Sequence, residues 1–136
     1  MDSNHPNKEF IYVKDDPNHI LQEITALEVS HDGQFLFTCH AGTRVGVMQW
    51  QLSSKILQRR LQFAEITYVL MVAVSEDMSR LILYGLTAEA SGQVLFVDLD
   101  NSQLLAVCSY SHKQPWHVKA LAFVPHSHDR FVSCGI

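Results

Sequence analysis

The sequence repeats one pattern three times, and this repetition limits the fold more than any other feature. Each copy has an alternating apolar strand, a short polar turn and a second apolar strand that ends in small residues. The copies occupy residues 24–40, 68–85 and 118–135. Val29 and Val74 are 45 positions apart, and Phe123 follows Val74 by 49 positions. A period of this length, built from short strands, is typical of β-propeller blades with four strands each.

Two more strands complete each of the first two copies. We expect them over residues 45–51 and 55–62 in the first copy, and over residues 94–98 and 103–109 in the second. Residues 55–65 also have the composition of a helix, but their place in the repeat favours an outer strand followed by a loop. The third copy has only its first two strands before the sequence ends. The expected fold is therefore all-β: an incomplete propeller of two four-stranded blades and about half of a third.

These boundaries divide the chain into four parts. Residues 1–23 form an N-terminal segment with one candidate strand over residues 9–14, which would belong to a preceding blade or close the ring. Residues 24–66 form the first repeat, 67–112 the second and 113–136 the truncated third. Open blades expose strand edges and apolar faces, so we expect the chain to be poorly soluble when it is expressed alone. The remainder of the propeller is one expected partner.

Charge and composition exclude several classes of function. The net charge is −4, and Arg59 and Arg60 form the only adjacent basic pair, so nucleic-acid binding is not expected. The most apolar run, residues 68–74, is too short to cross a bilayer, and the polar first residues do not resemble a signal peptide. The three cysteines are odd in number and widely spaced, which argues against a disulfide framework. We expect a cytoplasmic protein with no membrane partner.

The turns and strand ends resemble those of the WD40-repeat family. Residues 29–33 (VSHDG) match the turn of a family repeat. Trp50 stands where the family has the tryptophan of its Trp-Asp pair, and Asp98 stands at the aspartate of the same pair in the second repeat. The resemblance covers residue 24 to the C-terminus. It implies a non-enzymatic scaffold that displays its turns to other proteins.

The sequence departs from the family pattern in two respects. The Gly-His pair that opens many family repeats is missing, and residues 41–43 (AGT) replace the usual aspartate before the third strand. We therefore expect the Asp-His-Ser-Trp hydrogen-bond tetrad to be absent and both blades to be held mainly by apolar packing. Such degenerate repeats are similar to those of cilium-, centriole- and microtubule-associated WD-repeat proteins. That similarity implies tubulin or ciliary and centriolar components as partners, and the cytoskeleton or cilium as the location.

The chain has eight histidines, and four of them fall within 17 positions: His112, His117, His126 and His128. A His-x-His pair on a strand puts two imidazoles on one face, as a metal site requires. Here the pair falls in a turn and no carboxylate or cysteine is placed to complete the ligands, so no metal is expected. Neither a GxSxG motif nor a phosphate-binding glycine loop is present. We expect no cofactor and no enzymatic activity.

Two tryptophans and three arginines are candidates for an interaction surface. Trp50 is expected to pack between blades, whereas Trp116 lies in the linker before the third repeat and is a candidate for an exposed contact. Arg44, Arg80 and Arg130 are expected in corresponding turns of different repeats. They suggest an alternative function, a substrate-recognition propeller that binds an acidic or modified peptide. That alternative requires the three arginines to converge on one face; otherwise they are ordinary solvated turn residues.

Overall fold

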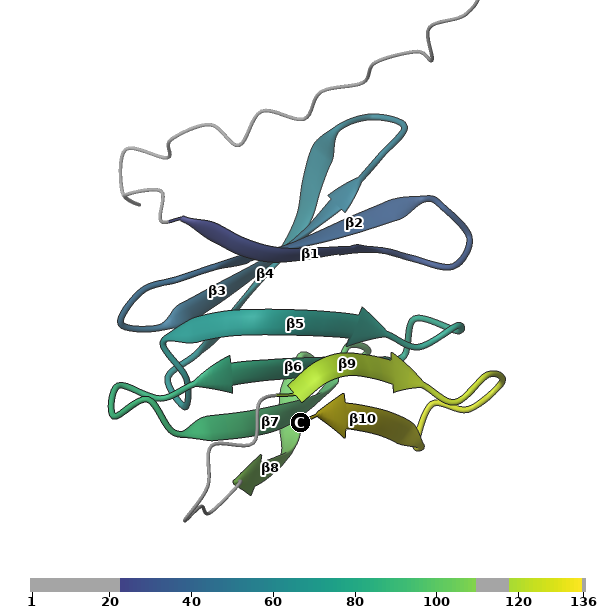
Figure 1. Ribbon diagram of the computed structural model, residues 1–136. Helices are drawn as coiled ribbons and strands as arrows, with labels where there is room; N and C mark the ends of the chain where they lie inside the picture. Colours follow the sequence, from purple (N-terminus) through teal and green to yellow (C-terminus); the bar gives the residue numbers. More distant parts are fainter. Residues whose placement is uncertain (1–22, 110–117, 136) are drawn as a thin grey trace, which may run out of the picture.

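The computed structural model describes residues 23–109 and 118–135, and the side chains of residues 118, 119 and 133–135 are left out of the description. These described residues form ten strands (Figure 1). These are β1 (Ile24–Val29), β2 (Phe35–His40), β3 (Val45–Gln51), β4 (Ile56–Phe63), β5 (Tyr68–Val74), β6 (Arg80–Leu86), β7 (Gly92–Asp98), β8 (Gln103–Ser109), β9 (Val118–Phe123) and β10 (Phe131–Gly135). The described residues form no helix long and apolar enough to span a membrane.

The strands form three antiparallel sheets in chain order. β1 to β4 make one four-stranded sheet, β5 to β8 make a second, and β9 pairs with β10. Successive strands pair as hairpins, so each sheet is a meander of the kind found in a propeller blade. The expected all-β architecture, with two four-stranded units and a smaller third, is confirmed. β4 is a strand, so the helical alternative for residues 55–65 is wrong.

Register shows that the first two sheets are copies of one unit. Leu36 pairs with Trp50 across β2 and β3, and Leu81 pairs with Val97 across β6 and β7. Each sheet also has a bulge near the start of its first strand and another between its third and fourth strands. Bulges increase the local twist of a sheet, so the two units share their distortions as well as their pairing.

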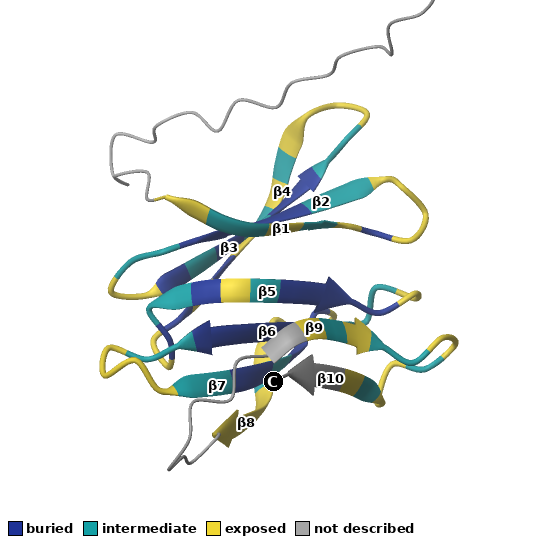
Figure 2. Ribbon diagram, in the orientation of Figure 1, coloured by how far each residue is buried: buried dark blue, intermediate teal, exposed yellow. Residues whose placement is uncertain are grey.

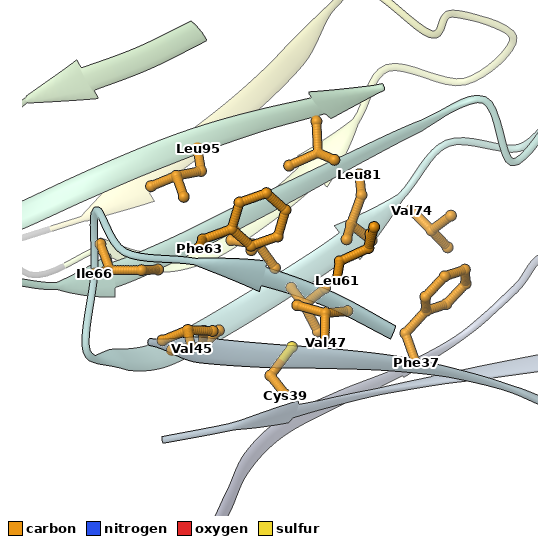
Figure 3. Close-up of a cluster of buried hydrophobic side chains, with 14 of the residues drawn as sticks. Phe37, Cys39, Val45, Val47, Leu61, Phe63, Ile66, Val74, Leu81 and Leu95 are labelled. Atoms are coloured by element: carbon orange, nitrogen blue, oxygen red, sulfur yellow. The ribbon is translucent and has the colours of Figure 1, made fainter. Parts of the chain in front are cut away.

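The two large sheets pack on each other through different faces. The shared core takes Phe37, Cys39, Val45, Val47, Leu61 and Phe63 from the first sheet, and Val72, Val74, Leu81, Leu83, Leu95 and Val97 from the second (Figure 3). In the second sheet, the face in this core carries Leu81 and Val97, which are the counterparts of Leu36 and Trp50. In the first sheet, Leu36 and Trp50 lie on the face turned away from this core. Units related by rotation about a common axis pack in this way, because each presents the same face to the unit before it.

The third unit follows the same rule. Leu121, Phe123 and Phe131 pack against Ile82, Tyr84 and Val94 of the second sheet. Phe131 opposes Phe123 across β9 and β10, as Leu81 opposes Val74 across β5 and β6. In the first sheet, the face that carries Leu27 and Val29 is not packed against another sheet among the described residues. Leu27 is 61% exposed and Val29 is 42% exposed (Figure 2). Their counterparts Val72 and Val74 are buried.

Candidate functional site: the turns at one end of the blades

Three turns lie at the same end of the sheets, on the right in Figure 1. They are the β1–β2 turn (residues 30–34), the β5–β6 turn (residues 75–79) and the β9–β10 turn (residues 124–130). We call them together the turn face. Because each turn joins the first two strands of its unit, the packing of the units brings the three turns to the same end. The turn face is the feature that the repeat builds most consistently.

The first turn is held by the side chains of Ser30 and Asp32. The Ser30 hydroxyl donates to Asp32 Oδ1 (2.5 Å), and the amide of Gln34 donates to the same oxygen (3.0 Å). The Ser30 hydroxyl oxygen in turn accepts from the amide of Phe35 (3.0 Å). Gly33 has a φ of 74°, in the left-handed region that glycine adopts without strain. Local side-chain hydrogen bonds of this kind fix the turn without help from other elements.

The second turn repeats this chemistry with different residues. The hydroxyls of Ser75 and Ser79 donate to Asp77 Oδ1 (2.8 and 2.7 Å), as does the Ser79 amide (3.0 Å). These hydrogen bonds lower the pKa of Asp77 from 3.8 to about 2, because they stabilise the carboxylate. The pKa of Asp32 is also lowered, mainly by the Ser30 hydroxyl. Both aspartates are therefore fixed negative charges of the turn face.

Counted between paired strand residues, the third turn is one residue longer than the second: Phe123 pairs with Phe131, and Val74 pairs with Leu81. Val124 donates to the carbonyl of Arg130 (2.9 Å), whereas the equivalent bond of the second turn joins Ser75 to Arg80. Its own Ser-Asp pair is displaced along the chain, with the Ser127 hydroxyl donating to Asp129 Oδ1 (2.7 Å). That hydrogen bond is the largest cause of a lowered pKa at Asp129.

Histidines link the second and third turns. Nδ1 of His126 lies 3.1 Å from Oε2 of Glu76, and the His126 amide donates to the same oxygen at 3.1 Å. Nδ1 of His128 lies 3.7 Å from Oδ2 of Asp77. These contacts join residues of neighbouring units, so they link the two turns. They were not predicted from the sequence, although the separation of Glu76 and His126 is one repeat period.

These contacts also account for two of the histidines considered as metal ligands. His126 and His128 each face a carboxylate of the neighbouring turn. Among the described residues, no three histidines, cysteines or acidic side chains are grouped as a metal site requires. His112 and His117 lie outside the described residues. Of the cysteines with described side chains, Cys39 is buried, and burial raises the pKa of its thiol to about 12. Cys108 is exposed on β8.

The three arginines do not come together. Arg80 and Arg130 lie at the turn face, at the starts of equivalent strands, but Arg44 lies in the β2–β3 turn at the opposite end (Figure 1). The expectation that all three occupy corresponding turns is wrong for Arg44, because β1–β2 and β2–β3 turns lie at opposite ends of an antiparallel sheet. Arg80 is also engaged within its own unit, 3.1 Å from Oδ1 of Asp98. The candidate residue Trp116 lies outside the described residues.

The Asp98 side chain stabilises the β7–β8 turn through hydrogen bonds. Its Oδ1 accepts from Arg80 and from the amide of Asp100, and its Oδ2 accepts from the side chain of Asn101 at 2.8 Å. These hydrogen bonds lower its pKa, the one from Asn101 most of all. Asp98 therefore caps the β7–β8 turn and ties it to the start of β6.

Trp50 is buried, and in the first sheet a buried hydrogen-bond chain adds to the apolar packing that the sequence predicted. The Trp50 indole N–H donates to the Thr38 hydroxyl oxygen (3.0 Å), and that oxygen lies 3.0 Å from Nε2 of His40. The three side chains are buried. Leu83 and Val97 take the places of Thr38 and Trp50 in the second sheet, where the expected apolar packing is found. The hydrogen-bond chain was missed because His40 comes from the strand itself rather than from an entry loop.

Comparisons with known proteins bear on the fold. No protein-family model and no curated protein sequence matches the chain. The structure is similar to the RRP9 WD40 repeats, with a TM-score of 0.63 and 23% identity over 85% of this chain and 33% of that one. It is also similar to the Myceliophteria thermophila Cps50 (Swd1) β-propeller domain, with a TM-score of 0.66 and 16% identity over 85% of this chain and 32% of that one. The described part of the chain has the fold of part of a WD40 β-propeller.

The WD40 fold does not by itself decide the function. The Kuenenia stuttgartiensis hydrazine synthase is a further structural neighbour, with a TM-score of 0.59 and 14% identity over 74% of this chain and 28% of that one. That neighbour is named as an enzyme. This chain spans about a third of the length of the structures that it matches. Partners and activity therefore have to be argued from the chain's own surface.

Proposed function

We propose that this chain is part of a non-enzymatic WD40 scaffold that binds other proteins through its turn face. The observation that carries this proposal is the internal bonding of that face. The serine and aspartate side chains of the turns hold the backbone, and histidines join two neighbouring turns. A surface that is ordered before binding loses less conformational entropy when a partner docks. Such a surface suits recognition.

The charge of the turn face favours a basic partner. Asp32, Glu76, Asp77 and Asp129 contribute four negative charges, whereas Arg80 and Arg130 contribute two positive ones. The Arg80 guanidinium already forms an ion pair with the Asp98 carboxylate. Complementary charge guides association and disfavours partners of the same sign. A lysine- or arginine-rich segment of another protein is therefore a better match for this face than an acidic peptide.

A pair of triple variants tests this proposal. His31, Gln34 and Glu76 are exposed on the turn face, and none of their side chains forms a hydrogen bond within its own turn described above. Changing all three to alanine should abolish capture of partner proteins by the purified chain. The matched control changes Thr43, Arg44 and Glu89, exposed at the opposite end, to alanine. Loss of partners in the control, with retention in the turn-face variant, would refute the proposal.

The acidic-peptide function is a second candidate, supported only by Arg130 and by its position on the turn face. Binding of phosphorylated and lysine-rich peptides of equal length to the same protein would separate the two. Preference for phosphopeptides, lost in Arg130→Gln, would favour the second candidate. Preference for lysine-rich peptides, weakened by Glu76→Gln, would favour the first.

The narrower proposal places the scaffold in cilium-, centriole- or microtubule-associated assemblies of the cytoplasm. It is supported by the degenerate repeats alone. Co-sedimentation with polymerised tubulin at low salt is its direct test, because electrostatic contacts are strongest there. A chain that stays in the supernatant under these conditions would remove tubulin as a partner and leave the general scaffold proposal intact.

A further inference from the structure

The outer strand of the second sheet is unusual in composition. β8 is the last strand of the order β5-β6-β7-β8, so one of its edges has no strand beside it among the described residues. Its sequence, QLLAVCS, has no charged residue and no proline, and every residue except Leu104 is exposed (Figure 2). Leu105 is 46% exposed and Val107 is 40% exposed. An exposed, uncharged edge strand is a template for pairing with another strand.

The equivalent strand of the first sheet is protected. β4 is the last strand of the order β1-β2-β3-β4, and it carries Arg59 and Arg60 in its centre. The Arg59 side chain also donates to the carbonyl of Leu99 in the neighbouring sheet. Charges on an edge strand oppose pairing because they would have to lose water. The two units share their fold but differ at this edge, because β8 lacks the charges that β4 carries.

We infer that β8 pairs antiparallel with β8 of a second copy of this chain. A second copy fits this edge because the uncharged sequence of β8 is compatible with itself at every position. The bulge at Leu105 leaves residues 106–109 as the regular stretch. A twofold axis at Val107 places that residue opposite its own copy, Ala106 opposite Cys108, and Leu105 opposite Ser109. No pair contains a charge, and the two sheets join into one.

This pairing satisfies the physical requirements of a symmetric interface. A twofold axis uses the same patch on both copies, so both free edges are covered at once. Main-chain hydrogen bonds provide the affinity, and the Val107 side chains become a cross-strand pair on one face of the joined sheet. The contact lies at the middle of β8, away from the turns. It therefore adds self-association to the proposed scaffold without using the turn face.

The first experiment compares two lysine substitutions in the whole chain by sedimentation velocity over a range of concentrations. The wild-type chain should form a dimer. Val107→Lys places two like charges opposite each other and should weaken the dimer by about tenfold or more. Ile56→Lys is the matched control, because Ile56 is an apolar residue 58% exposed on the other terminal strand. A monomeric wild-type chain, or equal weakening by both substitutions, would overturn the inference.

The second experiment tests the register by oxidation of single cysteines on β8. In a Cys108→Ser background, Val107→Cys should form an intermolecular disulfide, because directly opposed residues lie within disulfide reach. Ala106→Cys in the same background lies opposite the substituted position 108, which has no thiol, and should link far more slowly. The other two cysteines, Cys39 and Cys134, are the same in both variants and do not affect the comparison. Equal rates of linkage at the two positions would contradict the register.

The two proposals fail in different ways. If Val107→Lys gives a monomer that still captures turn-face partners, self-association and partner binding are separate properties, as the inference requires. If the triple turn-face variant loses its partners and remains a dimer, both proposals stand. A dimer broken by the turn-face variant and unaffected by Val107→Lys would place the self-contact at the turns and refute pairing through β8.

Discussion

The indole N–H of Trp50 donates a hydrogen bond to the hydroxyl oxygen of Thr38, 3.0 Å away on the neighbouring strand. The same hydroxyl can donate its own proton to Nε2 of His40. Thr38 is therefore the centre of a buried polar chain within a sheet that otherwise packs through apolar side chains. Because buried polar groups cost free energy when they lose a partner, this chain makes the first sheet sensitive to change at Thr38.

Removing the Thr38 hydroxyl should destabilise the fold. Thr38→Val keeps the shape of the side chain but leaves the Trp50 N–H without an acceptor, so we expect a loss of about 1–3 kcal/mol in the free energy of unfolding. Thr38→Ser keeps the hydroxyl and should cost about 1 kcal/mol or less, for the lost methyl group. Urea denaturation followed by tryptophan fluorescence gives both values. Similar losses in the two variants would show that the hydroxyl is not the important group.

Gly85 should not tolerate a side chain. A Cβ at this position would lie 2.3 Å from the carbonyl oxygen of Tyr68 and 2.7 Å from Cδ1 of buried Ile66. The oxygen belongs to the backbone, so the strands must move apart, and we expect Gly85→Ala to cost about 3 kcal/mol or more. Gly46→Ala is the control, because its Cβ would meet only Cβ of His40 at 3.8 Å. Thermal melting should show a large drop for the first variant and little change for the second.

Lys55 should gain from replacement by glycine. It lies in the β3–β4 turn with a φ of 60°, a conformation that costs a residue with a side chain about 1–2 kcal/mol. Lys55→Gly relieves this strain but adds entropy to the unfolded chain, so a net stabilisation of up to about 1 kcal/mol is expected. Ser53→Gly, in the same turn, adds the entropy alone and should destabilise. A raised urea midpoint for both variants, or for neither, would be inconsistent with strain at Lys55.

The strands could be predicted from the sequence because each carries its own local signal. Alternating apolar residues predicted β1 and β5, and the Asp-Gly turn at Asp32 predicted the hairpin geometry of the first unit. The contacts between units had no such signal. His126 and Glu76 are recognisable as partners only after the turns are placed. Arg44 was grouped with Arg80, but Arg44 lies in the β2–β3 turn, at the opposite end of the sheets. Side chains that meet across repeats depend on packing, which a single repeat does not encode.

The same limit applies to the tetrad. The family pattern places its histidine in an entry loop, and the missing loop signal predicted that the tetrad is absent. The structure uses His40, two positions after Thr38 on the same strand, so both side chains point to one face. The spacing Thr-x-His followed by a tryptophan on the pairing strand could have indicated this arrangement. It would still have needed the register that pairs Leu36 with Trp50.

Acid should weaken the β5–β6 turn in a way that Asp77→Asn removes. The folded pKa of Asp77 is about 2, below its ordinary value of 3.8, so its carboxylate stabilises the fold above pH 4 and loses this effect as the pH falls toward 2. The difference in unfolding free energy between wild type and Asp77→Asn should therefore be largest at neutral pH and shrink below pH 4. Asp100→Asn, at an exposed turn position, is the control for general charge effects. A difference that stays constant from about pH 7 to about pH 2.5 would mean that the serine hydroxyls around Asp77 do not favour its charged form.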